Sequence, residues 1–70
     1  MPIINVHMLA GRSPAQKKAF IKEVAAVAMR TLDVPEHAVT IVLTDVPAEQ
    51  WGAGTRTIAD IRAAQPRPQA

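Results

Sequence analysis

Hydrophobic residues follow a period of two over positions 2–9 of the chain, which predicts a β-strand. Apolar side chains fall on both sides of this predicted strand. One side carries Ile4, Val6 and Met8, and the other carries Ile3, Asn5, His7 and Leu9. A strand with apolar residues on both sides is expected to be covered on both faces.

A helical period begins after a turn at 10–12. Ser13 is expected to be the N-cap, Pro14 suits the first helical position, and Gln16 stands where a capping box needs it. Apolar residues then recur three or four positions apart, at Phe20, Ile21, Val24, Ala25, Val27, Ala28 and Leu32. The residue before Pro35 is disfavoured in helical geometry, so the helix is predicted to end near Leu32.

A second strand is predicted over 39–45, where β-branched residues dominate. Strand, long helix and strand make a β-α-β unit, whose strands should be parallel with a right-handed crossover. The lengths agree, because eight strand residues span ~26 Å and a 19-residue helix spans ~28 Å.

The last third of the chain is predicted to be a loop at 46–50, a glycine-containing hairpin at 51–55, and a short helical turn capped by Thr57 that ends at Ala63. The fold class is therefore α+β: one β-α-β unit plus a C-terminal β-hairpin. Residues 1–64 form the expected domain, and residues 65–70, which include two prolines, form an expected flexible tail.

The composition predicts an oligomer. The chain has 70 residues, of which 49% are hydrophobic and 3% are aromatic. One helix covers only one face of two strands, and two strands alone do not make a stable sheet. The uncovered face or edges of the sheet are therefore expected to pack against other subunits.

Charge and cysteine content exclude several classes of function. There is no cysteine, and two histidines are too few for a metal cluster. The net charge is only +2, and Lys17, Lys18 and Lys22 are interpreted as a solvated helix face instead of a nucleic-acid footprint. No apolar run has the length of a membrane span, and no signal peptide is visible. We expect a soluble cytoplasmic protein without nucleic-acid or membrane partners.

Pro2 is the residue with the most unusual chemical potential. If Met1 is removed after synthesis, the ring nitrogen of Pro2 becomes a free secondary amine at the head of a strand. Such an amine can act as a base, an acid or a nucleophile, whereas the other prolines have only amide nitrogens. To act as a base near neutral pH it needs a lowered pKa, which apolar surroundings or a nearby cation would provide.

Several segments together resemble 4-oxalocrotonate tautomerase and its small relatives. They are Pro2-Ile3, the run His-Met-Leu-Ala-Gly-Arg-Ser at 7–13, the long helix, the Val/Ile strand, and Trp-Gly-Ala-Gly at 51–54. The resemblance implies that Pro2 shuttles a proton without a cofactor, that Arg12 binds a substrate carboxylate and that Trp51 forms an apolar wall. It also implies a homohexamer built as a trimer of dimers, or a heterohexamer.

One position departs from the family pattern. The second catalytic arginine of the family corresponds to Thr40 here. The threonine hydroxyl offers one neutral hydrogen bond in place of the charged, planar guanidinium of arginine. Arg56, which follows the glycine hairpin, is the preferred replacement, ahead of Arg62 and Arg30. Efficient turnover of a muconate-type dicarboxylate is therefore not expected.

The remaining polar residues are interpreted as structural. His7 is expected to pack or lie at an interface, Asp45 and Glu49 to be solvated, and Lys17 to lie on the helix surface with Lys18. Arg12 lies ~25 Å or more along the extended chain from Pro2, so a site that uses both must be shared between subunits.

The hypothesis is a cofactor-independent keto–enol tautomerase for a 2-hydroxy-dienoate or a phenylenolpyruvate-like acid. The enzymatic alternative is a hydratase, dehalogenase or biosynthetic relative in which Pro2 stays protonated as an acid. The non-enzymatic alternative is a structural subunit of a heterohexamer, in which a partner chain supplies the missing arginine.

Overall fold

The computed structural model describes residues 1–65 and confirms the predicted α+β class. The elements follow in the order β1 (Ile3–Leu9), α1 (Pro14–Leu32), η1 (Glu36–Ala38), β2 (Thr40–Val46), η2 (Ala48–Gln50), β3 (Gly52–Ala53), β4 (Arg56–Thr57) and α2 (Ile58–Ala63). The flexible tail was predicted over 65–70. Of it, only Gln65 is described, and its N–H donates to the Arg62 carbonyl at 3.2 Å, whereas 66–70 lie outside the described residues.

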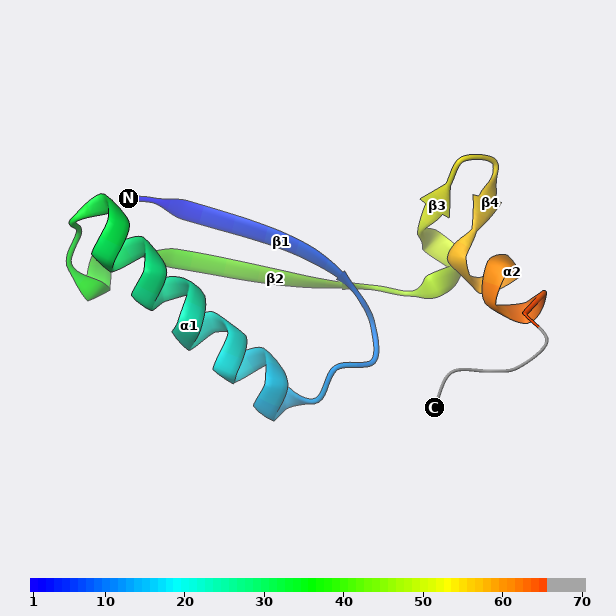
Figure 1. The fold of residues 1–70 in the computed structure, drawn as a ribbon, viewed down its shortest axis with the longest axis horizontal. Coiled ribbons are helices and arrows are strands. Elements are labelled where there is room, and N and C mark those ends of the chain that lie inside the picture. The colour runs from blue at the N-terminus through cyan, green and yellow to red at the C-terminus, as the bar shows by residue number, and fades with distance from the viewer. Residues whose placement is uncertain (66–70) are drawn as a thin grey trace.

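Strands β1 and β2 pair in parallel, from Ile3 beside Thr40 to Leu9 beside Val46, as predicted. The long helix α1 connects the two strands in sequence. It runs in the direction opposite to theirs and lies across one face of the pair (Figure 1). The prediction that a loop begins at Val46 was wrong. Val46 is the last residue of β2, because it pairs with Leu9 and its carbonyl accepts the Ala10 N–H at 2.9 Å.

The start of α1 is fixed by the capping box that the sequence predicts. The Ser13 hydroxyl accepts the Gln16 N–H at 3.1 Å, and the Gln16 side-chain oxygen accepts the Ser13 N–H at 2.9 Å. These two bonds satisfy N–H groups that have no partner within the helix. The turn before the cap needs a glycine, since Gly11 has a φ of 129°.

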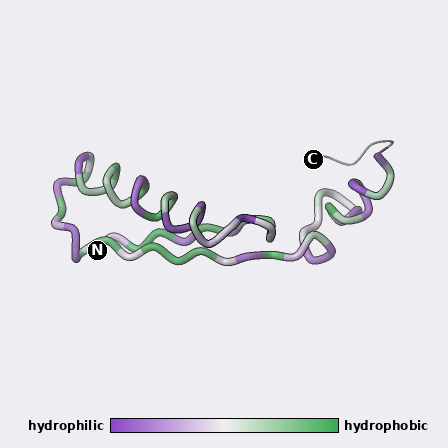
Figure 2. The backbone as a smooth tube through the Cα atoms, turned by 90° about the horizontal axis from the view of Figure 1, so that it is seen from below, coloured by the Kyte–Doolittle hydropathy of each residue, from purple (hydrophilic) through white to green (hydrophobic). Residues whose placement is uncertain are grey.

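The hydrophobic core within one chain is very small. Ala28 of α1 is the only buried residue in 1–65, and it is still 6% exposed. Ile4, Val6 and Met8 are half-buried on the side of the sheet that faces α1. On the other side Ile3 is 56% exposed and Val42 46% exposed, and Figure 2 shows no element covering that side. The expectation that both faces of β1 are covered is therefore not met within one chain.

The C-terminal lobe lies beyond the end of the β1–β2 sheet (Figure 1). Positions 48–50, predicted as loop, form the short helix η2, because the Gln50 N–H bonds back to the Pro47 carbonyl at 2.9 Å. Strands β3 and β4 form the predicted antiparallel hairpin, with Gly54 at a φ of 68° in the turn. Thr57 caps α2 as predicted, since its hydroxyl accepts the Asp60 N–H at 3.1 Å.

Within 1–65, no helix is long and apolar enough to cross a membrane.

Candidate functional site

Pro2 is held at the head of β1 by the neighbouring strand. Its carbonyl accepts the Thr40 N–H at 3.0 Å, and the residue is half-buried. With Met1 present, the terminal amine lies in front of Pro2 and donates to the Ala38 carbonyl at 2.7 Å. Removal of Met1 would leave the ring nitrogen of Pro2 as the terminal amine of this ordered strand.

Thr40 lies beside Pro2, as the parallel pairing predicts. The contact is made by the backbone, through the hydrogen bond to the Pro2 carbonyl. Thr40 is also the register partner of Ile3, so its side chain lies with that of Ile3 on the face that α1 leaves uncovered. The hydroxyl is exposed there, where a substrate or another subunit can reach it.

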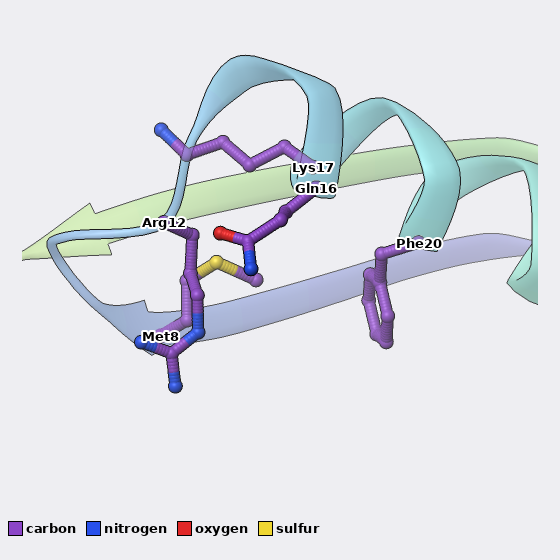
Figure 3. Close-up of a pocket in the computed structure, with 5 residues that line it drawn as sticks. All are labelled: Met8, Arg12, Gln16, Lys17 and Phe20. Atoms are coloured by element: carbon purple, nitrogen blue, oxygen red, sulfur yellow. The ribbon is translucent and has the colours of Figure 1, made fainter.

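Arg12 lies at the opposite end of β1, in the turn that leads into α1. It lines a cavity of 320 Å³ together with Met8, Gln16, Lys17 and Phe20 (Figure 3). Met8 and Phe20 supply apolar walls, and the Arg12 guanidinium supplies a cation with a planar set of donors. A small acid with an apolar body matches this combination of groups.

An ion pair that the sequence analysis missed joins α1 to β2 beside this cavity. The Lys17 ammonium binds the Asp45 carboxylate. Asp45 is exposed, as expected, but its pairing with Lys17 was not predicted. The two residues meet because the turn at 10–12 returns the chain, so that the first turn of α1 lies over the ends of the strands. The pairing register gives the missing signal, since Asp45 is the partner of Met8.

Trp51 and Arg56 belong to the C-terminal lobe. Trp51 is half-buried, and its carbonyl accepts the Ile58 N–H at 2.8 Å. Arg56 is exposed, and its guanidinium donates to the Asp60 carbonyl at 3.5 Å, a long bond that holds it only loosely. Both residues follow the end of β2, whereas Pro2 precedes the start of β1 (Figure 1).

One chain therefore separates the predicted site residues into two groups. Pro2 and Thr40 lie together at the start of the parallel strands, and Arg12, Trp51 and Arg56 follow the ends of those strands. Of the alternative cations, Arg30 lies in the last turn of α1 and Arg62 in the last turn of α2. His7 and Glu49 are exposed.

Comparison with known proteins places the chain among the tautomerases. A family model described as tautomerase enzyme matches residues 2–61. The chain is 41% identical to a 2-hydroxymuconate tautomerase of Stutzerimonas stutzeri over 54 residues, which are 77% of this chain and 86% of that protein. It is 36% identical to a 2-hydroxymuconate tautomerase of Pseudomonas putida over 62 residues, which are 89% of this chain and 98% of the relative.

Solved structures give the same result. TomN, a 4-oxalocrotonate tautomerase homologue in the tomaymycin biosynthetic pathway, superposes with a TM-score of 0.88 at 38% identity, over 90% of this chain and 97% of TomN. A heterohexamer 4-oxalocrotonate tautomerase from Chloroflexus aurantiacus superposes with a TM-score of 0.82 at 32% identity, over 89% of this chain and all of that chain.

Proposed function

Because this chain belongs to the tautomerase enzyme family and is an isomerase of the 4-oxalocrotonate tautomerase type, we propose that it ketonises the enol of a small 2-hydroxy acid with the amine of Pro2. The substrate is a 2-hydroxy-dienoate or a phenylenolpyruvate-like acid. The relatives named 2-hydroxymuconate tautomerase support the dienoate class. No cofactor takes part.

The position of Pro2 carries this proposal. After loss of Met1, the amine of Pro2 directly precedes β1, and the Pro2 carbonyl accepts a hydrogen bond from the Thr40 N–H. An ordered base can take the proton from the enol oxygen and return a proton to carbon, which gives the ketone. Acid–base groups positioned in this way contribute rate factors of ~10² to 10⁴.

The proposed active site is shared between subunits of a hexamer. Arg12 anchors the substrate carboxylate, and Trp51 shapes an apolar wall, but neither lies at the Pro2 end of its own chain. Exposed apolar residues on the uncovered sheet face and along α1 are suited to pack against other copies, and they are Ile3, Val42, Phe20, Ile21, Val27 and Leu32. The heterohexamer among the similar structures supports a six-chain assembly.

Replacement of Pro2 tests the mechanism. We expect Pro2→Ala to lower kcat/KM for ketonisation of phenylenolpyruvate by ~10² or more, because alanine leaves a primary amine without the ring. Intact mass must first show that Met1 is absent from both proteins. Equal rates, or a wild-type protein that retains Met1 and is nevertheless active, would contradict the mechanism. No activity in either protein would leave the structural-subunit hypothesis.

The second candidate keeps Pro2 protonated as a general acid, as in a hydratase, dehalogenase or biosynthetic relative. Two observations support this candidate. Thr40 stands where the resemblance implies an arginine, and TomN, which has a similar structure, belongs to a biosynthetic pathway. The pH profile separates the two. A base gives a kcat/KM that rises with pH through the pKa of the amine, and an acid gives one that falls.

A further inference from the structure

The cavity beside Arg12 has a charge balance that predicts which acids it accepts. Two cationic side chains line it, those of Arg12 and Lys17. Their positions suggest at first that the cavity would take a dicarboxylate, with one cation for each carboxylate. The surroundings of Lys17 lead to a different conclusion.

Lys17 already has an anionic partner. The Asp45 carboxylate reaches it from β2, and they form the only ion pair among residues 1–65. Arg12 forms no ion pair with an acidic residue of 1–65. The three charges at the cavity therefore sum to +1, and the uncompensated cation is Arg12.

Asp45 is held next to the cavity by the fold. It pairs in register with Met8, which is itself a cavity residue. In Figure 3 the side-chain amide of Gln16 lies between the guanidinium of Arg12 and the ammonium of Lys17, so the two cations do not converge on one point. A second carboxylate that approached Lys17 would meet a cation already neutralised by Asp45.

We propose that Asp45, by pairing with Lys17, makes this cavity selective for monocarboxylates over dicarboxylates. Asp45 is thus a specificity-determining residue that acts through Lys17 and touches no substrate itself. This inference rests on the proposed function insofar as Arg12 is taken to be the carboxylate anchor. It adds a cause for narrow specificity that is independent of Thr40, which lies at the other end of the strands.

Binding of two matched acids tests the proposal without turnover. Sorbate and trans,trans-muconate share a six-carbon diene and differ in having one or two carboxylates, and neither has the hydroxyl group that ketonisation needs. Their dissociation constants should be measured by calorimetry at low ionic strength, where screening is weak. The proteins are wild type, Asp45→Asn, Lys17→Gln, the double variant, and Glu49→Gln as a control with the same change of net charge.

Asp45→Asn should release Lys17 and improve muconate binding relative to sorbate by up to about fivefold, the range of an exposed ion pair. In the double variant the charge sum returns to +1, so the wild-type ratio should return. Glu49→Gln should leave the ratio unchanged. Thermal unfolding of each variant shows whether loss of the ion pair has disturbed the fold.

Three results would overturn the inference: a muconate-to-sorbate ratio that Asp45→Asn does not change, the same shift in the double variant, or no binding of either acid to the wild-type protein. Each of them can occur while Pro2→Ala abolishes ketonisation. Conversely, the binding ratio can respond as expected in a protein whose Pro2 is inactive. Failure of the selectivity proposal is therefore distinguishable from failure of the proposed function.

Discussion

Among single residues, we expect Thr40 to have the clearest consequence for activity, because it lies beside Pro2 where the family resemblance implies an arginine. We expect Thr40→Arg to lower KM for 2-hydroxymuconate by roughly tenfold, since a hydrogen bond to a charged group contributes ~1.5–3 kcal/mol against ~1 for a neutral one. Steady-state kinetics with this dicarboxylate and with phenylenolpyruvate would measure the change. The dicarboxylate should gain much more than the monocarboxylate.

Thr44→Arg is the matched control for Thr40→Arg. Thr44 lies on the same strand and on the same uncovered face, but beside His7 instead of Ile3. Native mass should show that both variants keep the wild-type assembly. Equal kinetic effects from the two substitutions would mean that added positive charge, and not its place beside Pro2, is responsible.

At the scale of single elements, the entry into α1 positions Arg12, which directly precedes the capping Ser13. We expect Ser13→Ala to cost ~1 kcal/mol of stability and Ser13→Gly only a few tenths, because glycine is tolerated at an N-cap. Urea unfolding at one fixed protein concentration would compare the three proteins, since assembly makes stability concentration-dependent. Equal midpoints for wild type and Ser13→Ala would show that the bond from the Gln16 N–H to the Ser13 hydroxyl, at 3.1 Å, adds nothing.

The sequence predicts elements well here because local chemistry decides them. The Ser13 cap, the stop before Pro35 and the positive φ of Gly54 each depend on residues a few positions apart. It predicts their ends less well, because the end of a strand depends on its partner. Val46 stays in β2 only because Leu9 lies opposite, and nothing within 46–50 itself encodes that pairing.

The candidate site could be predicted only in part, for the same reason. Pro2 and Thr40 are neighbours because parallel pairing brings their strands into register, and the order of elements predicts that pairing. The Lys17–Asp45 pair is 28 positions apart in sequence and follows from the exact return path of the turn at 10–12, which periodicity does not determine. Long-range side-chain contacts of this kind need the structure.

For the whole molecule, the small core of one chain and the separation of Pro2 from Arg12 lead to a single expectation about assembly. If each active site takes Pro2 from one subunit and Arg12 from another, two inactive variants should complement each other. Pro2→Ala chains retain Arg12, and Arg12→Ala chains retain Pro2. Unfolded together in equal amounts and refolded, they form mixed oligomers in which about a quarter of the sites have both groups intact.

We therefore expect the refolded mixture to regain roughly a quarter of the wild-type kcat for phenylenolpyruvate, while each variant refolded alone stays inactive. The two variants mixed without unfolding provide the control, because subunits that do not exchange cannot build a mixed site. Native mass spectrometry would confirm that the refolded oligomers contain both chains. Mixed oligomers without activity would place both groups in one chain's site, which the opposite ends of β1 argue against. Activity of the Arg12→Ala protein refolded alone would remove Arg12 from the catalytic mechanism.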